Sequence, residues 1–303
     1  MNDLPLIECI ANVSEGRNSQ VIATIVQAIE SVPGVAVLHQ TSDHDHHRSV
    51  ITFVGRGPAV AEAAFRLVAE AARLIDLDQH YGAHPRVGAC DVLPFVPLGS
   101  ATLAECVALA EQVGARIGAE LGLPVYLYEA AARRPERRNL ADVRRGGYEA
   151  LKASIHTSER KPDFGPSVVG KAGAVIVGAR QPLIAYNVFL TTNDVKIAQA
   201  IAKAVRASSG GLAGVKALGL LVDGRAQVSM NLVDHQRTPL HRVMELIRRE
   251  CQRYGVAVLK SELIGLIPQQ ALYDAAAWYL QLDDFGPERV LEQRLMQYVN
   301  VLE

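Results

Sequence analysis

The chain has 303 residues, of which 49% are hydrophobic and 21% charged, as expected of a globular protein with one large domain or two ordinary ones. Its net charge of −1 leaves no overall basic field for nucleic-acid binding, and no apolar run reaches the roughly 18 residues of a membrane helix. No signal peptide is visible at the start, and the four cysteines form no close pair. We therefore expect a cytoplasmic protein without disulfides and without nucleic-acid or membrane partners.

Strands and helices alternate through the first half of the chain. A helix is expected over residues 18–31, and Pro58 fits the first turn of an alanine-rich helix that ends near Ile75. Thr102 and Glu105 have the spacing of a capping box, which predicts a third helix. The apolar runs of this half predict strands at residues 6–13, 34–41, 49–55, 91–98 and 124–128.

A polar, arginine-rich stretch follows at residues 129–173 and contains a short helix near 148–154 and then a long loop. Loops of that length are usually functional or disordered. The regular pattern restarts at Ala174, with one helix capped by Asn193 or Asp194 and another by Thr238. The strands predicted from here on are residues 174–179, 183–190, 215–222, 226–233 and 255–259, and the chain is expected to finish helically.

These patterns predict an α+β fold of two α/β-sandwich subdomains, each a mixed β-sheet with helices packed on one face. We place the boundary so that the subdomains comprise residues 1–179 and 180–303. A cleft between two such subdomains is a favoured site for a small molecule, and we expect the ligand there.

One histidine stands out because of its neighbours. In "YGAHPRVG", Pro85 disfavours helical geometry at His84, and Gly82 and Gly88 permit tight turns. His84 should therefore lie in a constrained loop that leads into a strand, where side chains often meet ligands. An imidazole can accept and return a proton near neutral pH, which suits general acid–base catalysis. A loop histidine bonded to the backbone is the alternative, and spacing alone does not decide between them.

A second cluster, "DHDHH" at residues 43–47, has the composition of a metal site. Strand alternation would send neighbouring side chains to opposite faces, so only two or three could reach one ion, and no second cluster completes the set. A metal site, a polar loop facing a ligand and a solvated surface all stay open here, and we expect no metal.

Three further polar stretches could contact a ligand. "NVSEGRN" follows the first strand and would place Asn12 and Glu15 in a loop at its end. "PDFGPS" holds Asp163 in a stiff turn, which is also a common structural element. An arginine cluster suits carboxylate or phosphate recognition, or forms a solvated face; its members are Arg133, Arg134, Arg137, Arg138, Arg144 and Arg145.

Taken together, these segments resemble the glutamate formimidoyltransferase family, the folate enzymes of histidine degradation. The resemblance covers nearly the whole chain in order, and the animal members carry an additional fused cyclodeaminase domain. The matching stretches are "ECIANVSEGRN", "RSVITFVG", "LIDLDQHYGAHPRVGACDVLPFVPL", "PVYLYEAA", "GGYEAL", "PDFGPS", "VGARQPLIAYNVFL" and "QVSMNLVDHQRTPLH".

The resemblance implies roles for particular residues. The catalytic histidine of the family falls on His84. The folate-binding loop that follows "DFGP" falls on Gly165, Pro166, Ser167, Val168, Val169, Gly170, Lys171, Ala172 and Gly173. We expect substrate contacts from Asn12, Glu15, His47, Arg48, Arg86 and Asp163. Two positions differ from the family: the loop lacks the aromatic residue of the animal enzymes, and His47 replaces a common asparagine.

The implied activity is a one-carbon group transfer. The formimidoyl group of N-formimidoyl-L-glutamate would move to N5 of the co-substrate tetrahydrofolate, giving 5-formimidoyltetrahydrofolate and L-glutamate. The resemblance also implies a homodimer whose ligands are small molecules. The alternatives are formyl transfer between folate and glutamate on the same fold, a metal-dependent phosphoesterase built on "DHDHH", and a folate-binding module without turnover.

Overall fold

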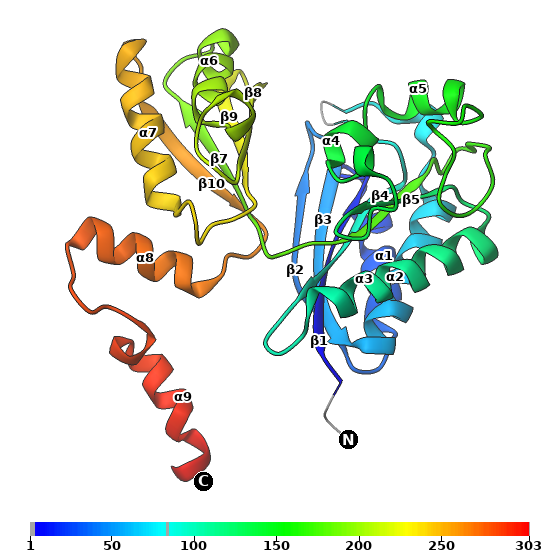
Figure 1. The fold of residues 1–303 in the computed structure, drawn as a ribbon, viewed down its shortest axis with the longest axis horizontal. Coiled ribbons are helices and arrows are strands. Elements are labelled where there is room, and N and C mark those ends of the chain that lie inside the picture. Colours follow the sequence, from blue (N-terminus) through cyan, green and yellow to red (C-terminus); the bar gives the residue numbers. More distant parts are fainter. Residues whose placement is uncertain (1–3, 83–84, 303) are drawn as a thin grey trace. The chain divides into compact units, whose positions relative to one another are not determined.

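The computed structural model describes residues 4–82 and 85–302, and the chain divides into two compact units, Met1–Gln181 and Pro182–Glu303 (Figure 1). Each unit has its own β-sheet and its own hydrophobic core. Among the helices of the described residues, none is long and apolar enough to cross a bilayer.

The first unit is built on a six-stranded mixed sheet in the order β2-β3-β1-β4-β6-β5. Its strands are β1 (Leu6–Val13), β2 (Val35–Asp43), β3 (Arg48–Arg56), β4 (Cys90–Pro97), β5 (Val125–Glu129) and β6 (Val175–Ala179). Strands β2, β3, β1 and β4 pair antiparallel, whereas β6 pairs parallel with both β4 and β5. The sheet thus combines an antiparallel half with a parallel half.

Helices cover one face of this sheet, and the core lies between the two layers (Figure 1). The helices of the unit are α1 (Ser19–Glu30), α2 (Gly57–Leu74), α3 (Leu103–Arg116), α4 (Leu140–Val143) and α5 (Gly147–Ser154). The Asn18 side chain accepts from the first turn of α1, and the capping box of Thr102 and Glu105 predicted for α3 is confirmed. Alternation along β1 sends Ile7 and Cys9 into the helix-covered core.

The second unit has a four-stranded sheet in the order β10-β7-β9-β8, antiparallel throughout. Its strands are β7 (Ile184–Leu190), β8 (Val215–Val222), β9 (Arg225–Leu232) and β10 (Val258–Ile264). Its helices are α6 (Val195–Val205), α7 (Leu240–Arg253), α8 (Gln269–Leu280) and α9 (Leu291–Leu302). The apolar sides of α6 and α7 pack on one face of the sheet, with Ile201 and Ile247 fully buried. The α+β class predicted from the sequence is confirmed, and the sheet of this unit is antiparallel rather than mixed as predicted, because all of its neighbouring strands pair antiparallel.

The two units share one winding. In the first, β1-α1-β2-β3-α2-β4 gives the spatial order β2-β3-β1-β4, and in the second, β7-α6-β8-β9-α7-β10 gives β8-β9-β7-β10. Both are βαββαβ units. In each, the first two strands are connected by a helix and lie on either side of the third strand, which runs antiparallel to both. The first unit extends this plan with α3, β5 and β6. The extension is what adds parallel strands to its sheet.

Two sequence predictions in the second unit are wrong. Thr238 does not cap α7, because its hydroxyl donates to the Ala213 carbonyl at 2.6 Å and Pro239 occupies the cap position. The strand predicted at residues 255–259 begins only at Val258. Gly255, with φ of +63°, ends α7, and the Val256 N–H then bonds back to the helix at 3.1 Å, so the strand cannot start earlier.

Candidate active site

Polar segments of the first unit converge at one end of its sheet, where β1 ends and β3 and β4 begin. Ser14, just after β1, donates its N–H to the Ala89 carbonyl at 2.8 Å and its hydroxyl to Gly88 at 2.7 Å. The Ser49 hydroxyl at the start of β3 donates to the Glu15 carbonyl at 2.5 Å. Because antiparallel neighbours place these strand ends together, residues distant in sequence share one site.

The backbone next to two loops is joined at this end: residues 77 and 87–89 flank the histidine segment (residues 80–82 and 85–86), and residues 171–174 end the glycine loop (residues 165–173). The bonds run from Ala174 N–H to Val87 O at 2.9 Å, from Ala89 N–H to Ala172 O at 2.8 Å, and from Leu77 N–H to Lys171 O at 2.8 Å. A Cβ on Gly88 would lie 1.8 Å from the Ala174 carbonyl oxygen, so only glycine fits there.

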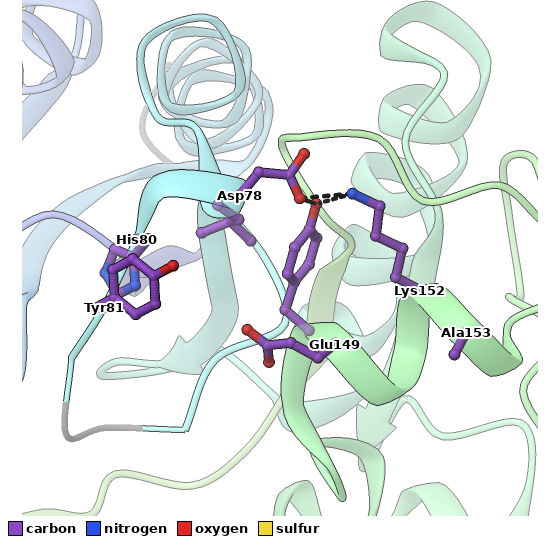
Figure 2. A pocket seen from close by; sticks show the side chains of 8 residues that line it. Asp78, His80, Tyr81, Glu149, Lys152 and Ala153 are labelled. Carbon is purple, nitrogen blue, oxygen red and sulfur yellow. Dashed lines mark hydrogen bonds and ion pairs between the residues drawn. The ribbon is translucent and has the colours of Figure 1, made fainter.

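A pocket of about 490 Å³ opens beside the histidine segment (Figure 2). Its lining residues are Leu77, Asp78, His80, Tyr81, Tyr148, Glu149, Lys152 and Ala153. Asp78 accepts hydrogen bonds from Lys152 at 2.6 Å and from the Tyr148 hydroxyl at 2.8 Å. These two hydrogen bonds hold the pKa of Asp78 below its ordinary value, and the bond from Lys152 has the larger effect. The pocket therefore presents both charge signs and the exposed Tyr81 ring to a ligand.

Glu15 and His47 form a second polar pair at this end of the sheet. The His47 Nε2 lies 3.1 Å from the Glu15 carboxylate, and both side chains are largely buried. Glu15 also accepts the backbone N–H groups of Arg17 at 2.7 Å and Asn18 at 2.9 Å. Burial alone would raise the pKa of Glu15, but the N–H groups of Asn18 and Arg17 and the His47 ring outweigh it and lower the pKa.

A buried group of charges lies beneath the site. The Arg144 guanidinium donates to Asp91, which also accepts the Val87 N–H at 2.8 Å. Arg48 is partly buried, and burial, together with the nearby positive charge of Arg144, lowers its pKa to about 9 against the opposing effect of Asp91 and Asp43. Two arginines therefore approach the same end of the sheet, where an anionic ligand would be favoured.

The residues predicted from the sequence occupy different places. His84 lies outside the described residues. Asn12 is 7% exposed at the end of β1, and its Oδ1 has no hydrogen-bond partner among the residues that the structure describes. Asp163 does not bond to any of the polar groups described above. Its carboxylate pairs with Arg137 at 2.5 Å and accepts the Leu127 N–H at 2.8 Å. The carboxylate of Asp163 thus fastens the start of the glycine loop.

The glycine loop has fixed ends and an exposed middle. Gly165, with φ of +78°, approaches Leu123 so closely that an added Cβ would lie 2.1 Å from the Leu123 carbonyl oxygen. Val169 and Ala172 are buried, whereas Val168 is 68% exposed. The loop therefore exposes residues 165–168, 170 and 171 to solvent, while Val169 and residues 172–173 are buried beneath them.

The "DHDHH" segment forms the end of β2 and the turn into β3. His44 points outward, with 76% of its side chain exposed, and His46 bonds to Asp43 at 3.0 Å. Within residues 4–82 and 85–302, no group of three or more His, Cys, Asp or Glu side chains is placed to hold one metal ion.

Several pocket residues were missed by the sequence reasoning. Asp78, Tyr148 and Lys152 come from a 3₁₀ turn (Leu77–Gln79) and from α5, and His80 was passed over beside His84. Tyr148 and Lys152 are four residues apart on a helix, so they share a face, which is a usable signal. Asp78 could not be linked to them without the fold.

Removing the Glu15 carboxylate should cost stability in a pH-dependent way. The pKa of Glu15 is lower in the folded chain than its ordinary value of 4.5, so its stabilising contribution is present above pH 4.5 and is lost as the pH falls below it. We expect Glu15→Gln to unfold at a lower temperature than the unaltered protein at pH 7, and the difference to shrink below pH 4.5. Thermal denaturation across this range measures it, with exposed Glu30→Gln as the control. Equal melting temperatures at pH 7 would contradict the assignment.

A polar pocket beside buried, hydrogen-bonded His, Arg and carboxylate groups on an α+β scaffold defines the class of enzymes that act on small polar molecules. Family models give the particular family: the formiminotransferase domain, N-terminal subdomain, matches residues 6–180, and the formiminotransferase domain matches residues 185–297. The chain belongs to the formiminotransferase domain family.

Characterised relatives match along nearly the whole chain. Glutamate formimidoyltransferase of Thermoplasma acidophilum is 48% identical, over 98% of this chain and 100% of the relative. The enzyme of that name from Streptococcus pyogenes serotype M1 is 47% identical, over 96% and 99%. Formimidoyltransferase-cyclodeaminase of Sus scrofa is 43% identical over 92% of this chain but only 53% of the relative. The chain therefore corresponds to about half of the fused protein.

Proposed function

We propose that this chain is a glutamate formimidoyltransferase, which moves the formimidoyl group of N-formimidoyl-L-glutamate to N5 of tetrahydrofolate. The observation that carries the proposal is the identity of 48% over essentially the full length of a relative with that name. Formation of 5-formimidoyltetrahydrofolate and L-glutamate places the reaction in histidine degradation. A pocket with charged groups of both signs suits reactants that carry carboxylates and an amidine.

His84 is proposed to move the proton that this transfer requires. N5 of tetrahydrofolate attacks the amidine carbon, forming a carbon–nitrogen bond and a tetrahedral intermediate. The imidazole takes the proton from N5 and delivers it to the glutamate nitrogen, so the bond to that nitrogen breaks and glutamate leaves as the neutral amine. A single imidazole can perform both steps, because histidine as a residue type can accept and return a proton near neutral pH.

The other predicted residues are proposed to bind and orient the two reactants. Residues 165–173, which include Pro166, Ser167, Gly170 and Lys171, would hold tetrahydrofolate, since the middle of this loop is exposed above a fixed base. Arg48 would attract a substrate carboxylate, and Asn12 and Glu15 would provide polar contacts. Holding both reactants in register contributes several kcal/mol to catalysis of this kind.

The proposal includes a cytoplasmic homodimer that acts without a metal ion. The transfer needs a nucleophile, an electrophile and a proton carrier, and the reactants and His84 supply all three. Light scattering on the purified protein tests the dimer: a mass near twice the 32.7 kDa chain is expected, and a monomer contradicts it.

A donor comparison tests the reaction itself. Purified protein is mixed with tetrahydrofolate and either N-formimidoyl-L-glutamate or N-formyl-L-glutamate, and product is followed by absorbance, with and without a chelator. We expect faster turnover with the formimidoyl donor and no effect of the chelator. Faster turnover with the formyl donor would replace the proposal with formyl transfer, loss of activity on chelation would indicate a metal enzyme, and binding without turnover would indicate a folate-binding module.

A further inference from the structure

Arg86 directs its guanidinium at protein atoms. Its Nε donates to His80 Nδ1 at 3.0 Å, and one terminal nitrogen donates to the His80 carbonyl at 2.9 Å. The terminal nitrogens also donate to both carboxylate oxygens of Glu149, at 2.8 and 3.1 Å. Only 14% of the Arg86 side chain is exposed. A planar fork bonded in this way on two sides has little capacity left for a substrate carboxylate.

His80 is fixed in one chemical form by these contacts. Its Nδ1 accepts from Arg86, so the ring proton is on Nε2, which donates to the His47 carbonyl at 2.9 Å. The residue is 2% exposed. Burial, together with the neighbouring His47 and Arg86, lowers the pKa of His80 against the opposing hydrogen bond to His47 and the charge of Glu15. Both ring nitrogens are therefore engaged, and the ring is a neutral structural link.

His47 completes the arrangement from the turn between β2 and β3. Its ring stacks on that of His80, with centroids 4.1 Å apart and planes 7° apart. Its Nδ1 lies 3.1 Å from the Tyr81 carbonyl oxygen, while Nε2 faces Glu15. Next to it, a Cβ on Gly82 would lie 2.4 Å from the His46 carbonyl oxygen, so the backbone touches the turn directly.

We propose that Arg86, His80 and His47 form a clasp that fixes both ends of the segment carrying His84, and that all three are positioning residues rather than substrate ligands. Arg86 binds His80 at the other end of the segment, and His47 contacts the Tyr81 carbonyl, so the two ends of the segment are fastened to the β2–β3 turn and to α5. The clasp itself is inferred from the contacts above, and only the reaction that it serves is taken from the proposed function. Misplacement of a catalytic group by about 1 Å can cost roughly 10²-fold in rate, which sets the scale of the effect.

Kinetics of Arg86 variants separate positioning from substrate binding. We expect Arg86→Ala to lower kcat about ten- to hundredfold with KM for both reactants changed less than about threefold. Arg86→Lys should not restore kcat, because one ammonium cannot reproduce the fork to His80 and Glu149. Arg73→Ala, which removes an exposed arginine on α2, is the matched control and should leave the rate unchanged. A raised KM for one reactant with unchanged kcat, or recovery in Arg86→Lys, would overturn the clasp.

A spectroscopic readout tests the clasp without any turnover. In ¹⁵N-histidine NMR, the resonances of His80, identified by their loss in His80→Gln, should show the neutral Nε2–H tautomer from about pH 5.5 to 8, and in Arg86→Ala the ring should exchange tautomers and titrate. A protonated or Nδ1–H ring in the unaltered protein would overturn the inference. If the unaltered protein transfers no formimidoyl group, the proposed function fails, whereas this measurement still decides whether the clasp exists.

Discussion

Replacement of His84 with alanine is expected to lower kcat by about 10²-fold or more while the chain stays folded. The uncatalysed alternative requires the glutamate nitrogen to leave without a positioned acid, and N5 to lose its proton without a positioned base. Both costs fall on the transition state rather than on binding, so KM for the two reactants should change little. Steady-state kinetics with N-formimidoyl-L-glutamate and tetrahydrofolate measure the effect.

The matched control for this variant is His156→Ala, which removes an exposed histidine after α5. Added imidazole should restore part of the lost rate in His84→Ala, because a small base can enter the space left by the side chain. Near-normal turnover in His84→Ala, with an unchanged melting temperature, would reject the proton-transfer role. A large rise in KM at constant kcat would instead assign His84 to binding.

The largest loss of stability should follow removal of Arg137, whose side chain is 4% exposed and pairs with the 5% exposed Asp163 at 2.5 Å. Deleting one partner of a buried ion pair leaves an uncompensated charge and costs about 3–5 kcal/mol. Arg137 also lies over the Tyr126 ring, 4.9 Å from its centroid, so packing is lost as well. We expect Arg137→Ala to lower the melting temperature of the first unit by roughly 10 °C.

Arg145→Ala is the control for that experiment. Arg145 pairs with Asp142 on the surface, with 75% of its side chain exposed, and an exposed pair contributes at most about 1 kcal/mol. The double variant Arg137→Met with Asp163→Leu removes both buried charges and should recover much of the lost stability. A melting temperature for Arg137→Ala equal to that of the control would show that the pair does not hold the glycine loop.

Local signals in the sequence identified most of the elements because they act over a few residues. Asn18 caps α1 and the Thr102–Glu105 box opens α3, since a cap is a bond between near neighbours. The failure at Thr238 has the same origin: its hydroxyl bonds to Ala213, a distant residue that no local pattern includes. Strand order and the shared winding of the two units likewise depend on pairing across the chain.

Only part of the candidate site could be predicted from the sequence. Glu15 and His47 were both expected near a ligand, but their bond to each other joins β1 to the β2–β3 turn and could not be derived from spacing. Asp163 and Arg137 carry charges that suggest ligands, yet the fold pairs them in its interior. A charged residue in a sequence does not reveal whether its partner is a substrate or another side chain.

The backbone bonds between residues 87–89 and 172–174 carry an evolutionary consequence. An insertion or deletion in either stretch would shift the other out of register, because two N–H groups and two carbonyl groups must continue to meet. Descendants of this enzyme can therefore lengthen or diversify the glycine loop only between its anchored ends, from Pro166 to Val168, where the chain is exposed. A change of length in one of the two bonded stretches would require a matching change in the other.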